Sequence, residues 1–234
     1  GKKLIPGMEA ATTQDFLMIK SPSTPFRNAT EFVGVVNGAA HPLTLFSLAG
    51  QIGVGRLFGI LKQLTAGLKE PVTTMAGLKY FSALPIRFGE HAVKYAMWPA
   101  QEIDGASRGG GGANALREDL AARLREGALR YELRVQAYTD AVKTPIEDGS
   151  VEWKEGDSPF VTVADVVLPQ QDVTSAKGRR VEAFVEKLSF DPWHASVELR
   201  PIGNMMRARN HAYRLSTIER GAAPEPDGSE RFDD

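Results

Sequence analysis

The stretch RYELRVQAY, residues 130–138, decides the fold class. Polar and apolar side chains alternate along it, as in a β-strand with one buried face. The apolar face carries Tyr131, Leu133, Val135 and Ala137. Two further strands are predicted downstream, FVTVADVVL at 160–168 and VEAFVEKLSF at 181–190. Strands that follow one another in this way favour antiparallel pairing over βαβ crossovers.

Upstream of this stretch the pattern becomes helical. Four glycines at 109–112 interrupt regular structure. Asn114 is then the expected N-cap of a helix over residues 115–126, whose leucines recur every four positions, and Gly127 ends it. Residues 80–99 have an extended pattern that closes at a proline. Helices grouped before and after a set of strands predict an α+β fold with an antiparallel sheet or barrel.

The N-terminal third is expected to hold one strand, at residues 15–20, followed by helices. Asn28 is the predicted N-cap of the first helix, with Glu31 three residues later as in a capping box. Residues 42–66 are typical of one or two apolar, glycine-rich helices. The motif GVGRLFG at 53–59 imitates a dinucleotide-binding loop but has no strand before it, so we interpret it as close helix packing through small residues.

Composition excludes several classes of function. The 28 Lys and Arg residues balance 29 Asp and Glu residues, for a formal charge of −1, so we expect no nucleic-acid partner. The absence of cysteine excludes disulfides, thiolate metal sites, iron–sulfur clusters and cysteine nucleophiles. No two of the four histidines are spaced to share one helical face, so we expect no zinc site among His41, His91, His194 and His211.

The most informative segment is PIGNMMRARNHAYRLSTIER, which predicts a helix over residues 205–220. Arg209 and Tyr213 are four residues apart and therefore lie on one face. Arg220 returns to that face two turns after Tyr213. A guanidinium beside a phenol favours the phenolate, which is a ligand for ferric iron. The alternative interpretation is a surface helix that carries arginines and packs its tyrosine on the core.

Three segments, in this order, resemble the catalase superfamily, in particular its small bacterial catalase-like haem proteins. They are residues 14–32 (QDFLMIKSPSTPFRNATEF), residues 158–172 with 184–192 (SPFVTVADVVLPQQD and FVEKLSFDP), and residues 204–220 with the Arg-x-x-x-Tyr spacing. The resemblance implies an antiparallel β-barrel of the catalase type with flanking helices, incomplete at its N-terminal side. The match over residues 40–155 is loose.

The resemblance also implies site residues for haem b. Tyr213 is the implied ligand of the haem iron, and Arg209 the residue that keeps it ionised, so that these two form the catalytic pair. Arg220 is implied to neutralise a haem propionate. The remaining implied contacts to the cofactor are Phe32, Phe190 and Met205 on the porphyrin, with Ala212 and Ser216 lining the proximal side.

This sequence departs from the family pattern on the distal side. The family's distal histidine lies upstream of residue 1, and its distal asparagine falls near Ile19 and Lys20, where no amide exists. We therefore expect a C-terminal portion of a haem-binding domain over residues 1–220. An acidic disordered tail is expected over 221–234. The expected partner is an upstream segment of the same polypeptide, or a separate chain, that completes the barrel.

The implied function is a haem-dependent, peroxide-metabolising oxidoreductase of catalase or peroxidase type. Its substrate would be hydrogen peroxide or an organic or lipid hydroperoxide. One alternative is a fatty-acid hydroperoxide-transforming enzyme of allene oxide synthase type, because the apolar residues 42–64 could line a lipid channel or contact a membrane surface. Another is a non-catalytic haem-binding module. A homo-oligomer and a cytoplasmic location complete the expectations.

Overall fold

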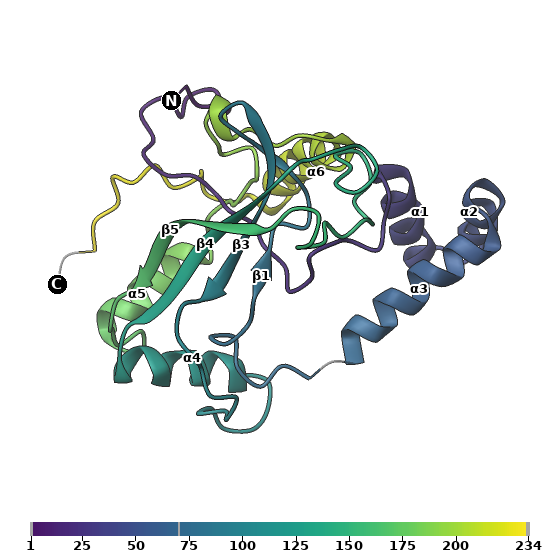
Figure 1. Cartoon of the computed structure of the whole chain (residues 1–234). Coiled ribbons are helices and arrows are strands. Elements are labelled where there is room, and N and C mark those ends of the chain that lie inside the picture. Colours follow the sequence, from purple (N-terminus) through teal and green to yellow (C-terminus); the bar gives the residue numbers. More distant parts are fainter. Residues whose placement is uncertain (1, 70, 233–234) are drawn as a thin grey trace.

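One antiparallel sheet organises the molecule (Figure 1). The computed structural model describes residues 2–69 and 71–232. Within these residues the strands follow the order β1-β3-β4-β5, and β2 also pairs with β3. Their bounds are Tyr80–Phe81 for β1, Ile86–Phe88 for β2, His91–Pro99 for β3, Leu129–Ala137 for β4 and Phe160–Leu168 for β5. The strands predicted at 130–138 and 160–168 and the extended segment 80–99 are confirmed.

The two faces of β4 are covered by different parts of the chain. Tyr131 is buried, and Leu133 and Val135 of the same face pack against the core. On the opposite face the amide of Gln136 donates hydrogen bonds to the carbonyl oxygens of Trp153 (2.7 Å) and Ser158 (2.6 Å). The loop between β4 and β5 thereby closes over the polar face, while the apolar face predicted from the alternation points into the core.

The sheet does not close into a barrel within the described residues, which corrects the expected barrel. The strand order begins at β1 and ends at β5, and β5 pairs with β4 alone. Three valines of β5 keep between 41% and 56% of their surface exposed: Val161, Val163 and Val167. Closure would need a further strand beside β5, and among the described residues none lies there to pair with its outer backbone N–H and C=O groups.

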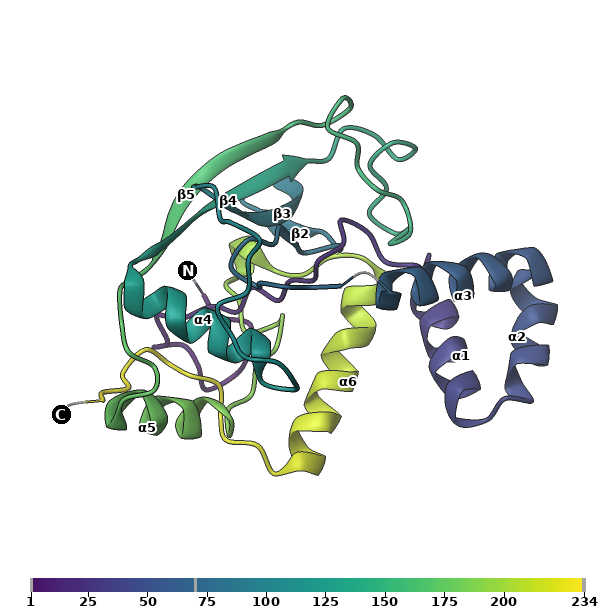
Figure 2. The same ribbon diagram turned by 90° about the horizontal axis from the view of Figure 1, so that it is seen from below.

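Three helices form an arm at one side of the sheet (Figure 1 and Figure 2). They are α1 (Ala29–Ala40), α2 (Thr44–Ile52) and α3 (Val54–Lys69). The side chain of Asn28 accepts a hydrogen bond from the backbone N–H of Glu31, which confirms the predicted N-cap. No single described helix is long and apolar enough to cross a membrane. The bent pair of α2 and α3 meets that requirement by length and composition only.

Glycines of the three-helix arm allow a bend and a close helix contact, but the close contact does not involve the GVGRLFG motif at 53–59. Gly53 has a φ of +88°, and α2 and α3 meet there at 115°. Gly55 and Gly59 face open space, so the interpretation of that motif as close packing is wrong. The close approach occurs instead between α1 and α2, where a Cβ on Gly34 would lie 2.6 Å from the Leu48 side chain.

The strand expected at 181–190 is wrong, because residues Ala176–Val185 form the helix α5. The hydroxyl of Ser175 caps this helix by accepting a hydrogen bond from the N–H of Gly178 at 3.0 Å. Val181 and Val185 are four residues apart and line a groove between α5 and α4 (Ala115–Glu126). The cap and this spacing are helical signals that outweigh the β-propensity of the valines.

The two ends of the chain lie against each other. Residues 15–20, the first expected strand, are coil that contributes only an isolated bridge from Ile19 to Phe81. Residues 221–232, expected to be a disordered tail, make defined contacts within the described residues. The carbonyl of Asp227 accepts from the N–H of Thr12 at 2.9 Å, and Phe232 packs edge-on against Phe184.

Candidate functional site

The helix α6 (Asn204–Arg220) carries the candidate site and is anchored by its first turn (Figure 2). Met205 and Met206 are buried in the main core cluster with Val93 and Tyr95 of the sheet. The side-chain oxygen of Asn204 accepts a hydrogen bond from the N–H of Ala29 at 3.1 Å, which ties α6 to the start of α1. The next turns of α6 are therefore held in a constant position relative to the sheet.

Arg209 and Tyr213 lie together on α6, as their spacing predicts. Nη2 of Arg209 donates a hydrogen bond to the Tyr213 hydroxyl oxygen at 2.7 Å. The guanidinium carbon also lies 5.0 Å from the centroid of the Tyr213 ring. Nη1 of Arg209 contacts the Met206 sulfur at 3.5 Å. The Tyr213 oxygen therefore accepts a charge-assisted hydrogen bond.

Buried polar groups surround Arg209. Burial raises the pKa of Asp191, while the backbone N–H of Trp193 and the Arg209 guanidinium oppose that rise. The indole N–H of Trp193 donates to the carbonyl of Met206 at 2.9 Å, which fixes this loop on α6. Arg209 thus bonds the Tyr213 phenol and acts electrostatically on the buried Asp191 carboxyl group.

Tyr95 of β3 forms the floor of this region. Burial raises the pKa of its phenol far above the ordinary value, and the Arg209 charge opposes this only in part. Its hydroxyl donates to the carbonyl of Leu17 at 3.0 Å, and its ring packs edge-on against Phe16. Tyr95 therefore stays a neutral phenol at physiological pH. The hydrogen bond from Arg209 is accepted by Tyr213 instead.

The other residues implied by the resemblance are distributed unevenly. Ala212, Ser216 and Arg220 are exposed on the side of α6 that carries Tyr213. Phe32 and Phe190 expose 43% and 44% of their surface, so their rings are open to a further partner. Met205 differs, because it packs inside the core cluster. The structure brings Arg209 and Tyr213 into contact and leaves the roles of the other six as predictions.

Residues 19–24 form the segment that the resemblance places on the distal side of the haem, and none of their side chains is an amide. Ile19 is 47% exposed, and the ammonium of Lys20 donates to the carbonyl of Gly67 at the end of α3 at 3.1 Å. The hydroxyl of Thr24 donates to the carbonyl of Phe26 at 2.8 Å. Within the described residues this segment connects the sheet to the arm.

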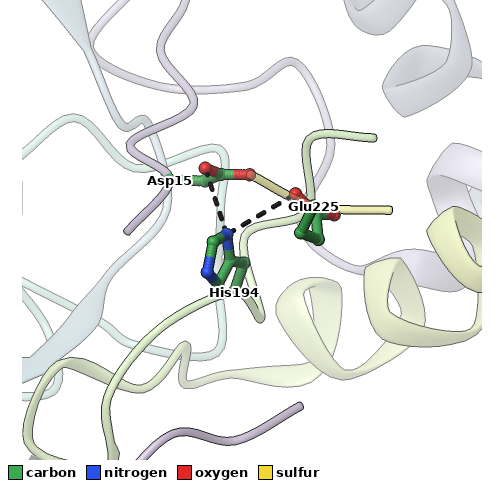
Figure 3. Close-up of side chains that lie close together, drawn as sticks. All are labelled: Asp15, His194 and Glu225. Carbon is green, nitrogen blue, oxygen red and sulfur yellow. Dashed lines mark ion pairs between the residues drawn. The ribbon is translucent and has the colours of Figure 1, made fainter. Parts of the chain in front are cut away.

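Sequence analysis missed a second cluster, formed by Asp15, His194 and Glu225 (Figure 3). Its members come from three coil segments that are far apart in the chain. Helical spacing, the only criterion applied to the histidines, cannot detect such a cluster. The sequence Asp-Pro-Trp-His at 191–194 indicates a turn, but it does not indicate that His194 meets two carboxyl groups.

The donor set at Tyr213 fits a ferric haem. Tyrosinate is the axial ligand used by catalases. Arg209 supplies the hydrogen bond that such a ligand requires, and Arg220 offers a cation on the same helix face for a carboxylate-bearing cofactor. The exposed rings of Phe32 and Phe190 are apolar surfaces suited to a porphyrin.

Comparison with solved structures identifies the fold. A bacterial catalase superposes with a TM-score of 0.63 at 17% identity, over 93% of this chain and 49% of its own length. Catalase A from Saccharomyces cerevisiae gives 0.61 at 16% identity, over 87% of this chain and 45% of its own. A fungal catalase superposes with a TM-score of 0.53 at 18% identity, over 63% of this chain and 32% of its own length.

No family model and no curated protein sequence matches the chain. The similarity to catalases is therefore one of fold, which agrees with the expectation drawn from the sequence. The chain spans about half of the length of the bacterial catalase and less of the other two.

Proposed function

We propose that this chain with a catalase-type fold carries the proximal side of a haem-dependent, peroxide-metabolising enzyme. The observation that supports the proposal most strongly is the 2.7 Å hydrogen bond from Arg209 to the hydroxyl oxygen of Tyr213. A bound haem b would supply the redox chemistry that splits the O–O bond of a peroxide. The chain's own residues would hold and tune that cofactor.

Tyr213 offers its phenol oxygen as the iron ligand, and Arg209 stabilises the negative charge on that oxygen. Because Met205 and Met206 anchor the first turn of α6 in the core, the ligand oxygen is held in position before the cofactor binds. Arg220 pairs with a haem propionate, and Ala212 and Ser216 are small enough to let a planar ring approach the helix. Phe32 and Phe190 pack on the porphyrin.

The proton-transferring residue of the distal side belongs to an upstream segment or a separate chain in this proposal. Such a segment would also pair with the exposed edge of β5, whose valines lack a neighbouring strand among the described residues. Hydrogen peroxide and organic hydroperoxides are both candidate substrates. The positions Ile19 and Lys20 carry no amide, which favours an organic hydroperoxide or a peroxidase reaction.

The first test is a titration of the purified chain with ferric haem, followed by absorption spectroscopy. We expect Tyr213→Phe to weaken haem binding at least about tenfold, since it removes the oxygen that ligates the iron, and to change the absorption bands. Tyr138→Phe is the matched control, because Tyr138 is also partly exposed but lies beside Trp153 in the loop. An unchanged spectrum in Tyr213→Phe would contradict the assignment.

A second candidate is rearrangement of a fatty-acid hydroperoxide, in the manner of allene oxide synthases. The observation that favours it is the apolar surface of the arm, where Leu43, Phe46, Val54 and Phe58 each expose between 69% and 80% of their surface. This surface suits an acyl chain or a membrane surface. Product analysis with a lipid hydroperoxide decides, because a rearranged lipid supports this candidate and oxygen release alone rejects it.

A further inference from the structure

Three coil segments meet at a buried point formed by Asp15, His194 and Glu225 (Figure 3). Asp15 belongs to the N-terminal coil, His194 to the loop after α5, and Glu225 to the coil after α6. Backbone hydrogen bonds fix the segments: the N–H of Asp15 donates to the carbonyl of His194 at 3.1 Å, and the N–H of Ala223 to the carbonyl of Lys187 at 2.7 Å. The cluster is thus positioned by the chain and not by chance side-chain conformations.

The three side chains are removed from solvent. His194 is fully buried, and the side chains of Asp15 and Glu225 are 6% and 8% exposed. Nδ1 of His194 lies 3.4 Å from Oδ1 of Asp15 and 3.5 Å from Oε2 of Glu225. Within the described part of the chain, neither this Nδ1 nor Oε2 of Glu225 has a hydrogen-bond partner. Buried polar atoms left in this way cost about 1–3 kcal/mol each.

The other ring nitrogen of His194 indicates the tautomer. Nε2 lies 3.4 Å from the hydroxyl oxygen of Thr13, and that hydroxyl donates its own proton to the carbonyl of Pro226. The Thr13 oxygen is therefore an acceptor, so Nε2 carries the imidazole proton. In the neutral ring with its proton on Nε2, Nδ1 keeps a lone pair that faces the two carboxyl groups. Such an arrangement is favourable when a proton or a metal ion lies between these atoms.

The carboxyl groups of Asp15 and Glu225 both face Nδ1 of His194. Oδ2 of Asp15 already accepts a hydrogen bond from the N–H of Asp191 at 2.8 Å, and the Asp191 carboxyl group is a third acid close by. The Arg209 guanidinium acts on Asp191 and is bound to Tyr213, and the Lys3 ammonium donates to the carbonyl of Thr13.

We propose that Asp15, His194 and Glu225 form a divalent metal site, for which zinc is the best fit. Zinc bonds of about 2.0–2.2 Å at a tetrahedral angle place ligand atoms about 3.3–3.5 Å apart. The two distances measured from Nδ1 match this value, and all three ligand atoms lie within 4.8 Å of one another. Two carboxylates and a neutral imidazole balance the charge of one divalent ion.

The donor set separates zinc from the hard cations. Calcium and magnesium take six or more oxygen ligands, whereas this cluster offers two carboxylates and one nitrogen. The contact of Nε2 with Thr13 supplies the orienting hydrogen bond that metal-bound histidines use. Because the ligands come from both ends of the chain and from the loop before α6, the ion ties the C-terminal coil to the N-terminal coil. Its donors are three side chains of the described residues, none of which takes part in the haem proposal.

The test uses the haem-free chain, stripped with a chelator and dialysed against zinc. We expect one equivalent of zinc by elemental analysis, and a rise in the unfolding temperature on adding zinc. Glu225→Gln and Asp15→Asn each remove one ligand charge and should reduce zinc retention at least about tenfold. Glu219→Gln, an exposed change on α6, should leave it unchanged, as should Tyr213→Phe, which isolates this proposal from the haem site.

Two outcomes would overturn the proposal. The first is wild-type protein that retains no zinc and whose unfolding temperature zinc does not move. The second is a wild type that takes up no zinc together with a metal-free Glu225→Gln protein that is more stable than wild type. This pattern would identify a proton shared between Asp15 and Glu225 as the compensating charge. If Glu225→Gln fails to fold, the zinc content of wild type and the zinc retention of Asp15→Asn still test the proposal.

Discussion

At the scale of single residues, the hydrogen bond between Arg209 and Tyr213 is the feature on which the proposed function depends. It joins side chains one helical turn apart, so it forms wherever α6 forms. The hydrogen bond from the half-buried Trp193 indole to the Met206 carbonyl and the anchoring of Met205 hold that turn against the sheet. Arg209 is a positioning residue, since it acts on the iron only through Tyr213.

The change Arg209→Ala removes the donor to the Tyr213 oxygen. We expect haem still to bind but with shifted absorption bands, since the phenolate loses its charge-assisted hydrogen bond. Arg209→Lys should restore part of the shift, because it keeps the charge without the two-pronged geometry. The measurement is the haem absorption spectrum of each variant. Arg214→Ala, an exposed neighbour on the same helix, is the control and should leave the bands in place.

At the scale of elements, a buried ion pair clamps the arm to the loop that precedes α1. The Arg56 guanidinium on α3 donates to both oxygens of Glu31 on α1, at 3.0 and 2.7 Å, and to the carbonyl of Pro25 at 2.9 Å. The Glu31 side chain is only 4% exposed. Burial by itself would raise the pKa of Glu31, but the hydrogen bonds from Arg56 and from the N–H of Arg27 outweigh it and lower that pKa.

Arg56→Ala should destabilise the chain by about 3 kcal/mol at pH 7, because it leaves the Glu31 carboxylate buried without its partner. Since the pKa of Glu31 is lowered in the folded state, the contribution of the pair is complete above the unfolded pKa of about 4.3 and is lost as the pH falls through the folded value. Urea unfolding at pH 7 and pH 3 measures the difference. Equal destabilisation at both values would contradict this account.

The control for Arg56 is Arg207→Ala. Arg207 pairs with Glu147 at 3.3 Å, but both side chains are about three-fifths exposed. Such a surface pair contributes less than about 1 kcal/mol. A loss as large as that of Arg56→Ala would show that burial is not what makes the Glu31 pair important.

At the scale of the whole molecule, the open edge of the sheet is the feature that bears on association with other chains. Among residues 2–69 and 71–232, β5 pairs with β4 alone, and three of its valines are exposed. An edge of this kind pairs readily with another strand, either from an upstream segment or from a second copy of the chain. The association state of the isolated chain therefore depends on this edge.

Val163→Lys should reduce self-association of the isolated chain, since a charge on an edge strand opposes pairing with a second copy. Light scattering coupled to size-exclusion chromatography measures the effect. Val142→Lys is the control, because Val142 is 84% exposed in the loop between β4 and β5 and lies on no edge. If both variants associate like wild type, the edge of β5 is not the contact.

Local pattern alone determined much of this protein. The alternation in residues 130–138 predicted β4, and the strand predicted at 160–168 is β5. The cap at Asn28 predicted the start of α1, and the spacing of Arg209 and Tyr213 predicted their contact. These features involve residues within a turn or a strand of one another, so their geometry follows from the period of the element.

Tertiary structure alone decided the rest. Closure of the barrel depends on a strand beside β5, and no pattern within β5 reports whether that strand is present. The helix α5 had a local signal in its Ser175 cap, but the groove beside α4 that receives Val181 exists only in the folded chain. Asp15, His194 and Glu225 are up to 210 residues apart, and only the folding of three coils against one another brings them together, since spacing in sequence carries no information on contacts between coils.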